Sequence, residues 1–428
     1  MKNVVIVDGV RTPYIKAGTL FNKLTAVDLG KIAMRELLAR TNLDSKLVNE
    51  VIVGNIAQPP EATNIARIIA LEAGVPKNVP AFSVGRNCAS GMQSIVDAYL
   101  RIVTGQADII LAGGVESMSK IPLLFSEKAT DKFAAIFKAR SVIERVGAIS
   151  QFRPGDFSPV IGILLGLTDG YCGLNMGVTA EVLAKEFGIT RKEQDEFAVM
   201  SHLRAGKATD DGILKQEIVP VYLPPTYKTV VDEDNGIRKN QNMEALTKLR
   251  PAFDKKFGTV TAGNASQITD GAAFVLVMSE EKAKDMGYDI LGYVRGFGFA
   301  GLDPERMGLG PVFSTPVALK HAGLTMKDIQ LIELNEAFAA QVIANERAFA
   351  SKQFANDVLH LPQAVGEIDR NKLNVNGGAI ALGHPVGSSA TRLVLTLLKD
   401  MKRRNLQFGL ATLCIGGGQG AAMILERK

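Results

Sequence analysis

Hydrophobic positions in the N-terminal part of the chain follow two alternating patterns. Short apolar runs bounded by polar residues or glycine predict strands, whereas apolar residues at three- and four-residue steps predict helices. The predicted strands cover residues 4–7, 50–53, 81–84 and 109–112, and the predicted helices cover residues 26–39, 64–73 and 92–103. Strands that alternate with helices in this way indicate a layered α/β domain.

The last third of the chain repeats the pattern of the first. Residues 43–55 and residues 324–335 each contain a helix end, a strand and an asparagine at the carboxyl end of the strand. A helix over residues 388–401 and a strand over residues 410–416 then match the last helix and strand of the first copy. Because both copies would present strand ends and helix starts to one cleft, residues distant in sequence can meet there.

A long segment of different character separates the two copies. It carries helical patterns, a polar stretch with prolines and a charged loop, and the first copy resumes at Gly258 with a strand predicted over residues 274–278. We therefore expect three units: an N-terminal half over residues 1–117 plus 258–289, a helical loop domain inserted over residues 118–257, and a C-terminal half over residues 290–428.

Composition narrows the class of protein. With 428 residues, of which 46% are hydrophobic, the chain can bury two or three cores. A net charge of +5, no Trp and 6% aromatic residues do not suit a nucleic-acid-binding surface. Three cysteines form no disulfide framework and fit a reducing compartment. The chain opens on a strand and has no apolar run long enough to span a bilayer, so we expect a cytoplasmic protein.

Three residues are candidates for chemistry. Cys88 lies between a predicted strand and the first turn of a helix, whose free amides and dipole favour the reactive thiolate. His384 lies in a glycine-rich loop and has the side chain best suited to remove a proton near neutral pH. Cys414 ends a predicted strand before a glycine run whose bare amides can form an oxyanion hole. Taken singly, Cys88 could be an inert core residue and His384 a hydrogen-bonded loop residue.

Six motifs in this order resemble the thiolase family over essentially the full length of the chain. They lie at residues 87–93, 113–119, 258–270, 335–338, 383–387 and 414–420. The resemblance implies an α/β fold of two duplicated βαβαβαββ halves in five αβαβα layers. It also implies a 3-ketoacyl-CoA thiolase, an acetyl-CoA C-acyltransferase of fatty-acid β-oxidation that uses coenzyme A to cleave 3-ketoacyl-CoA into acetyl-CoA and a shortened acyl-CoA.

The resemblance also implies catalytic roles. Cys88 would form the acyl-enzyme with His384 as its base, and Cys414 would protonate the departing acetyl-CoA carbanion. His384 and a water held by Asn335 would stabilise charge on a thioester oxygen, while the amides of Cys88 and Gly416 would hold the acyl-enzyme oxygen. We expect Glu336 to orient nearby donors.

The pantetheine arm of coenzyme A would lie along Met176, Ser266, Met307 and Phe338, although methionine and phenylalanine are more often core residues. Coenzyme A would be a co-substrate, and no permanently bound cofactor is expected. Cys172 reads as structural. No metal site is proposed, because His202, His321 and His360 lack metal-ligand spacing.

Within the insertion, residues 128–152 resemble the β subunits of fatty-acid oxidation trifunctional complexes. Apolar residues follow one helical stripe with basic residues around it: Phe133, Ile136, Phe137, Ile143, Val146 and Ile149. The resemblance implies a homodimer or larger oligomer and an α subunit with enoyl-CoA hydratase and 3-hydroxyacyl-CoA dehydrogenase activities. The stripe also suits peripheral contact with a membrane, or ordinary packing on its own domain.

Two positions depart from the family patterns. Asn175 stands where many thiolases have histidine, and Asn335 stands where trifunctional β subunits have histidine. Two rival functions therefore stay open: a short-chain acetoacetyl-CoA thiolase and a non-catalytic lipid carrier or scaffold. A ketoacyl synthase would carry histidine at Cys414, and a scaffold would need none of Cys88, His384 and Cys414.

Overall fold

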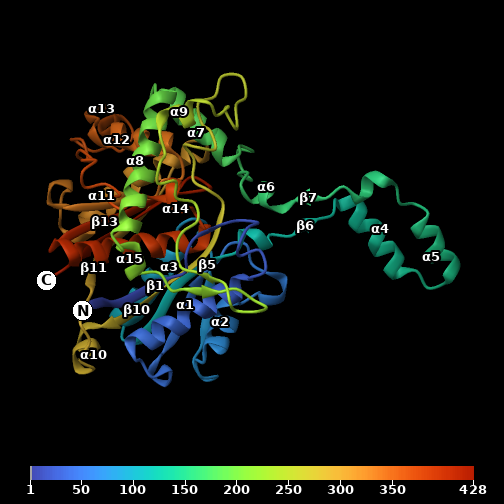
Figure 1. The fold of residues 1–428 in the computed structure, drawn as a ribbon, viewed down its shortest axis with the longest axis horizontal. Coiled ribbons are helices and arrows are strands. Elements are labelled where there is room, and N and C mark those ends of the chain that lie inside the picture. The colour runs from blue at the N-terminus through green and yellow to red at the C-terminus, as the bar shows by residue number, and fades with distance from the viewer. Residues whose placement is uncertain (1) are drawn as a thin grey trace.

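The computed structural model describes residues 2–428, which form a layered body and one projecting segment (Figure 1). Its main sheet has the strand order β12-β13-β14-β11-β1-β10-β5-β3-β4, with β2 paired to β10. The strands are β1 (Val4–Arg11), β2 (Ile15–Lys16), β3 (Glu50–Gly54), β4 (Ala81–Val84), β5 (Ile109–Glu116), β10 (Thr269–Ser279), β11 (Gly292–Gly301), β12 (Leu331–Leu334), β13 (Phe408–Ile415) and β14 (Gln419–Glu426).

The strand order confirms the predicted duplication. The N-terminal half runs β4-β3-β5-β10-β1 and the C-terminal half runs β12-β13-β14-β11, with β3–β5 and β12–β13 both parallel. Where β4 pairs with β3 in the first half, a single parallel bridge between Ile332 and Leu373 remains in the second. The halves join where β1 pairs antiparallel with β11, Val5 opposite Tyr293. The exact boundaries of the three units stay a prediction.

Alternating side chains divide the body into the five expected layers. Along β14, Ala421 and Met423 face one core while Ala422 and Ile424 face another, because successive strand residues point to opposite faces. The central core lies between the half-sheets and holds α3 (Ser90–Val103) and α15 (Val386–Arg404). Helices on the outer faces are α1 (Ala26–Thr41) and α2 (Ile65–Ala73) on the first half, and α11 (Gly310–Ala322) and α12 (Ala339–Ala350) on the second.

Local signals explain where several helices begin and end. Thr25 caps α1 through a reciprocal pair with Asp28, and Asn42 ends it in the left-handed conformation. Further helices and strands lie outside the layers: α6 (Gly162–Gly166), α7 (Met176–Glu186), α8 (Arg191–Asp210), α9 (Met243–Thr247), α10 (Glu280–Asp285), α13 (Lys352–Asp357), α14 (Ala379–Leu382), β8 (Val221–Tyr222) and β9 (Val230–Val231).

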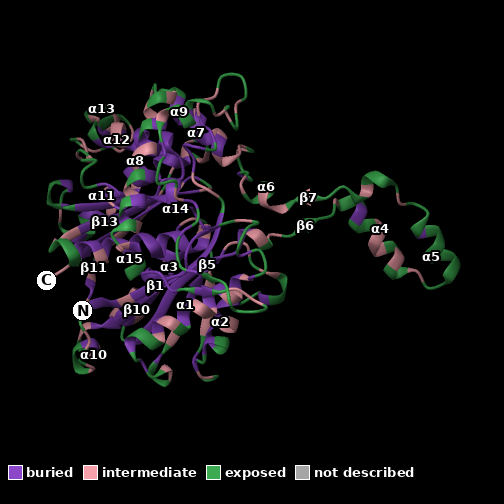
Figure 2. Ribbon diagram, in the orientation of Figure 1, coloured by how far each residue is buried: buried purple, intermediate pink, exposed green. Residues whose placement is uncertain are grey.

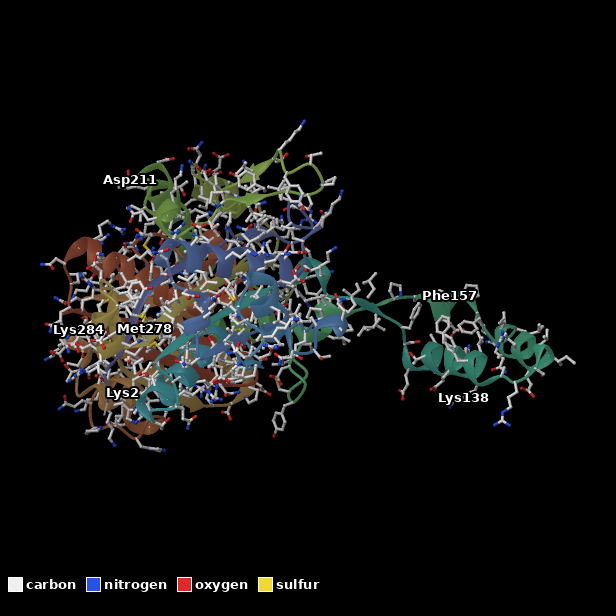
Figure 3. The ribbon with its side chains drawn as sticks, turned by 90° about the horizontal axis from the view of Figure 1, so that it is seen from below. Lys2, Lys138, Phe157, Asp211, Met278 and Lys284 are labelled. Carbon is white, nitrogen blue, oxygen red and sulfur yellow. The ribbon has the colours of Figure 1, made fainter. Side chains whose placement is uncertain are left out.

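Residues 123–161 form an arm that extends away from the body (Figures 1 and 3). Its root is a two-stranded ribbon of β6 (Leu123–Leu124) and β7 (Val160–Ile161), and its tip is a helical hairpin of α4 (Glu127–Lys138) and α5 (Val142–Ile149). The single helical stripe expected over residues 128–152 is therefore wrong, because the chain breaks at Ala139 and Ser141 caps a second helix.

The arm has an inner and an outer apolar surface. Phe133 packs between Phe125 and Phe152, with ring centroids 5.0 and 4.8 Å away. Phe137 and Ile143 are instead 87% and 86% exposed, and most of the arm is coloured as exposed in Figure 2. The apolar residues of the arm therefore do not pack against the body of the protein. No helix within residues 2–428 combines the length and apolar character needed to cross a membrane.

Candidate active site

Cys88 lies where the two halves meet. It follows β4 and precedes α3, after Asn87, whose backbone is in the left-handed region with φ of 41°. The side-chain amide of Asn87 donates to the carbonyl oxygen of Gly416, 2.7 Å away, and the Gly416 N–H donates to the sulfur of Cys88. The N-terminal half therefore supplies the thiol, and the C-terminal half supplies an amide that contacts it.

The structure reverses the expected state of the Cys88 thiol. Burial raises the pKa of Cys88, the N–H groups of Gly416 and of Cys88 itself lower it by less, and the charge of Glu116 makes the smallest contribution, which raises it. The first amides of the helix do not stabilise the sulfur, since Ala89 N donates to Arg86 O and Ser90 N to Asn87 O within the turn. Cys88 thus rests as a neutral thiol and needs a base.

His384 is held as a neutral imidazole with one nitrogen available. Its Nδ1 lies 2.6 Å from the hydroxyl oxygen of Ser389, and that hydroxyl donates its own proton to the carbonyl oxygen of Pro385. Nδ1 must therefore carry the hydrogen, which leaves a lone pair on Nε2. Burial, followed by the positive charge of Arg392, lowers the pKa of His384 to about 4.

Asn335 brings an amide to the free side of that imidazole. It directly follows β12, where its backbone N–H donates to Thr412 O of β13 at 3.0 Å. Its Nδ2 lies 3.5 Å from Nε2 of His384, and its Oδ1 has no hydrogen-bond partner among residues 2–428. Asn335 and His384 therefore place two polar groups, which can hydrogen-bond a ligand atom, at a buried point beside the strand ends.

Cys414 is a buried thiol near the end of β13. Burial raises the pKa of Cys414 and the nearby charge of Cys88 raises it further, so the two sulfurs are close enough to interact electrostatically. The turn that follows needs glycine, because Gly417 and Gly418 have φ of 91° and 75°. A cysteine that stays protonated in this place can act as a proton donor.

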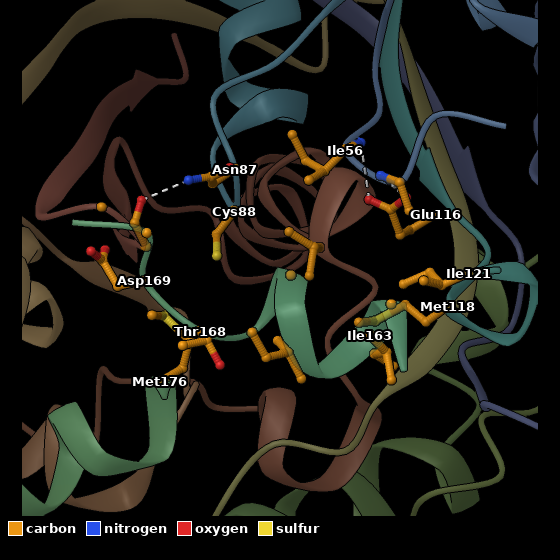
Figure 4. Close-up of a pocket in the computed structure, with 18 of the residues that line it drawn as sticks. Ile56, Asn87, Cys88, Glu116, Met118, Ile121, Ile163, Thr168, Asp169 and Met176 are labelled. Atoms are coloured by element: carbon orange, nitrogen blue, oxygen red, sulfur yellow. Dashed lines mark hydrogen bonds between the residues drawn. The ribbon is translucent and has the colours of Figure 1, made fainter. Parts of the chain in front are cut away.

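A cavity of about 440 Å³ opens beside Cys88 (Figure 4). Asn87, Asp169 and Met176 lie on one side of the thiol, and Met118, Ile121 and Ile163 lie on the other. Cys88, Gly416 and Met176 line this cavity together, whereas His384, Asn335 and Cys414 are buried and do not line it. The cavity thus has an apolar lobe that suits an acyl chain.

The four candidate pantetheine residues fall in different places. Met176 touches the catalytic turn, since a Cβ on Gly416 would lie 3.2 Å from its sulfur. Ser266 is half-buried and its N–H donates to Ala337 O, while Phe338 meets the ring of Phe253 edge-on. Met307 is buried in the core of the C-terminal half. Contact of these four residues with coenzyme A stays a prediction.

Glu336 and Asn175 have structural roles near the site. Glu336 accepts from Ser201, Asn374 and Ile380, so it orients the loop before His384. Asn175 caps α7 by accepting from the Gly177 N–H, a structural use for the residue that departs from the family pattern. Among residues 2–428, no cluster of three His, Cys, Asp or Glu side chains is arranged to hold a metal ion.

Sequence reasoning missed three residues that support the site. Ser389 sets the tautomer of His384. Asp169 accepts from the backbone N–H groups of Tyr171, Cys172 and Gly417, so it anchors the catalytic turn to the insertion. Glu116 lies in the motif at residues 113–119, but nothing in the sequence indicated that it contacts residues of both halves.

Comparison with known proteins places the chain in a family. The profile for the N-terminal domain of thiolase matches residues 4–281, and that for the C-terminal domain matches residues 288–427. The 3-ketoacyl-CoA thiolases of Yersinia pestis (strain Pestoides F) and Serratia proteamaculans (strain 568) are each 44% identical over 424 residues, covering 99% of this chain and 96% of theirs.

Solved structures agree with the sequence matches. The acetyl-CoA acetyltransferase of Bacillus anthracis superimposes with a TM-score of 0.87 at 36% identity, covering 100% of this chain and 99% of the other. Human mitochondrial 3-ketoacyl-CoA thiolase superimposes with a TM-score of 0.86 at 36% identity over the same shares. The chain therefore belongs to the thiolase family.

Proposed function

We propose that the protein is a 3-ketoacyl-CoA thiolase that works through an acyl-enzyme on Cys88. The main support is the position of Cys88 between the two halves. Its sulfur faces an apolar cavity and accepts a hydrogen bond from the N–H of Gly416 in the C-terminal half. His384, whose Nε2 carries no hydrogen and keeps its lone pair, supplies the base that a neutral thiol requires. Membership of the thiolase family and the names of its 44% identical relatives support the same reaction.

In the first half-reaction, Nε2 of His384 takes the thiol proton as the Cys88 sulfur attacks C3 of the 3-ketoacyl-CoA. The amides of Cys88 and Gly416 stabilise the oxyanion that forms at C3. The C2–C3 bond then breaks and its electron pair passes to C2, with charge shared by the thioester oxygen near Asn335 and His384. Cys414 gives its proton to C2, and acetyl-CoA leaves.

In the second half-reaction, coenzyme A enters as the nucleophile. The Cys414 thiolate takes the proton of the incoming thiol, and the coenzyme A sulfur attacks the acyl carbon on Cys88. The bond between that carbon and the Cys88 sulfur breaks, and the released thiolate recovers its proton from His384. The shortened acyl-CoA leaves, and both cysteines return to their neutral state.

The short-chain rival, an acetoacetyl-CoA thiolase, differs in the acyl group it accepts. A volume of about 440 Å³ with an apolar lobe exceeds the needs of an acetyl group and favours longer chains. The decisive measurement is coenzyme A-dependent cleavage of 3-ketoacyl-CoA substrates from four to sixteen carbons by the purified chain. Activity on long chains supports β-oxidation, and activity confined to acetoacetyl-CoA favours the short-chain enzyme.

The Cys88→Ala variant is the matched control for this assay. It removes the nucleophile from a half-buried position without adding bulk, so it should abolish turnover and leave the fold intact. Turnover that persists in Cys88→Ala would contradict the acyl-enzyme, and no turnover of the wild-type protein at any chain length would favour a carrier or scaffold.

We further propose that the arm docks on a partner subunit in an assembly built on a homodimer or larger oligomer. Phe137, Val142, Ile143 and Val146 are 60% to 87% exposed on a hairpin that stands clear of the body. An exposed apolar patch of this kind marks an interaction site. An α subunit with hydratase and dehydrogenase activities is the proposed occupant, and a membrane surface is the alternative, since Lys138, Arg140 and Arg145 flank the patch.

A further inference from the structure

Glu116 is a buried carboxylate beside the nucleophile that the mechanism above does not use. It ends β5 in the N-terminal half, is 1% exposed and lines the cavity that holds Cys88 (Figure 4). Burial raises the pKa of Glu116 to about 7, and its charge raises the pKa of the Cys88 thiol. A carboxylate at this position opposes formation of the Cys88 thiolate. The hydrogen bonds of Glu116 indicate a different role.

Four N–H donors surround the carboxylate, and no acceptor does. Oε1 accepts from the side-chain amide of Asn55 at 2.8 Å and from Ala57 N at 3.0 Å. Oε2 accepts from Gly387 N at 3.0 Å and from Ile56 N at 3.2 Å. Both oxygens must therefore be acceptors, which a carboxylate provides and a carboxamide of the same shape does not.

One of these donors belongs to the other half of the molecule. Gly387 lies in the first turn of α15, three residues after His384, whereas the other donors lie in the loop after β3. The contact is tight, because a Cβ on Gly114 would lie 1.9 Å from Gly387 O and a Cβ on Gly387 would lie 2.6 Å from Val115 O. The helix that follows the base is therefore seated directly on the strand ends of the nucleophile's half.

We propose that Glu116 is a positioning residue that fixes His384 of the C-terminal half relative to Cys88 of the N-terminal half. Its hydrogen bonds join the first turn of α15 to residues 55–57. They thereby fix the distance of the His384 imidazole from Cys88 and the position of one side of the acyl cavity. This inference rests on the proposed function for its kinetic consequences, but the clamp itself can be observed without turnover.

The Glu116→Gln variant separates positioning from charge. It keeps the shape, but its amide nitrogen faces two N–H donors whichever way it turns, so two hydrogen bonds are lost and the turn loosens. A role in charge alone predicts the opposite kinetic sign, because removal of the carboxylate lowers the pKa of Cys88. We expect kcat to fall 10- to 100-fold in Glu116→Gln, with KM for both substrates within threefold of wild type.

A double-mutant cycle tests whether Glu116 acts through His384. In a His384→Ala background, Glu116→Gln should change the residual rate by less than twofold, because the residue it positions is gone. If the double variant instead lost activity by the full product of the two single-variant factors, the proposal would be overturned. A kcat for Glu116→Gln equal to that of wild type would also overturn it.

Hydrogen exchange provides the readout that needs no catalysis. Amides over residues 384–392 should exchange faster in Glu116→Gln than in wild type, below the melting temperature of both. Glu217→Gln is the matched control: Glu217 is also buried and contacts α15, but at Thr396, far from His384. Glu217 also pairs with the buried Arg11, and the glutamine keeps an oxygen that can accept from Arg11. It should leave exchange at residues 384–392 and kcat unchanged, and unchanged exchange in Glu116→Gln would overturn the clamp. An inactive wild-type protein with the expected exchange would overturn the proposed function alone.

Discussion

The proposed catalytic pair, Cys88 and His384, consists of two neutral side chains, and this state has a measurable pH signature. Burial raises the pKa of the Cys88 thiol and lowers that of His384 to about 4, so above pH 5 no imidazolium is present to stabilise a thiolate. The thiolate fraction should therefore keep rising with pH past the pKa of free cysteine, about 8.5, without levelling off there. We expect the rate of Cys88 alkylation by iodoacetamide to increase steadily from pH 7 to pH 9.5.

His384→Ala is the control for this profile, since it removes the imidazole and should keep the same alkaline rise. A rate that is already level between pH 6 and pH 8 would indicate a thiolate–imidazolium pair and contradict the neutral state. Alkylation of Cys88 must be read by peptide mass, because Cys172 is also partly exposed.

The sequence motifs pointed to four candidate reactive residues, whose roles stay a prediction, but they indicated the wrong protonation state for Cys88. Cys88, His384, Asn335 and Cys414 each lie in a short motif, and the structure gathers them around the junction of the halves. The protonation of Cys88 depends on burial by segments distant in sequence, which outweighs the local helix start that the sequence displays. Local reasoning could have found Ser389, because it lies five residues after His384 and one helical turn after Pro385, to whose carbonyl oxygen its hydroxyl donates.

At the scale of elements, glycine allows β5 and α15 to touch. A Cβ on Gly114 would lie 1.9 Å from the backbone oxygen of Gly387, and no rotamer change can relieve a clash with backbone. Gly114→Ala should destabilise the fold by about 1–3 kcal/mol, the usual cost of overpacking. It should also lower kcat, because relief of the clash moves the helix that follows His384.

Gly147→Ala is the matched control for this substitution. Gly147 lies in α5 with open space around its Cα, so an added methyl should be tolerated and stabilise the helix by about 0.5–1 kcal/mol. Thermal or urea unfolding measures both variants. Equal stability of Gly114→Ala and wild type would show that the two elements can separate without cost.

The hydrophobic pattern predicted the strands of the layers because burial on both faces gives short apolar runs, and it predicted the outer helices because each buries one face. The arm lacks such a constraint: Phe133 of α4 packs on Phe125 before α4 and on Phe152 after α5, so a single helix and a hairpin have similar patterns. A signal for the break was present, since Ser141 stands three residues before Glu144 and caps α5.

At the scale of the whole molecule, the insertion contributes both to the lining of the cavity and to the projecting arm. Residues 118–121 and 162–171 contribute to the lining of the cavity, and the arm rises between these two stretches. The body that holds the cavity and the proposed docking surface on the arm are therefore continuous in the chain but separate in space (Figure 3). Substitutions at the tip of the arm should leave the chemistry intact.

The outer face of the arm gives the sharpest test of assembly. We expect wild-type protein isolated from its native source to co-purify with enoyl-CoA hydratase and 3-hydroxyacyl-CoA dehydrogenase activities. The double variant Phe137→Asp with Ile143→Asp should lose both activities from the purified fraction and keep the wild-type rate of thiolytic cleavage. Both side chains are more than 80% exposed, so the substitutions cost little folding energy and place charge where an apolar partner surface would lie.

Phe133→Asp is the contrasting variant, because Phe133 packs inside the arm and its loss should unfold the hairpin instead of altering its surface. Retention of the partner activities by the outer-face double variant would contradict docking through this surface. Sedimentation with anionic phospholipid vesicles distinguishes the membrane alternative: binding that needs Phe137 and Ile143, and that falls as salt screens Lys138, Arg140 and Arg145, would assign the arm to a lipid surface instead of an α subunit.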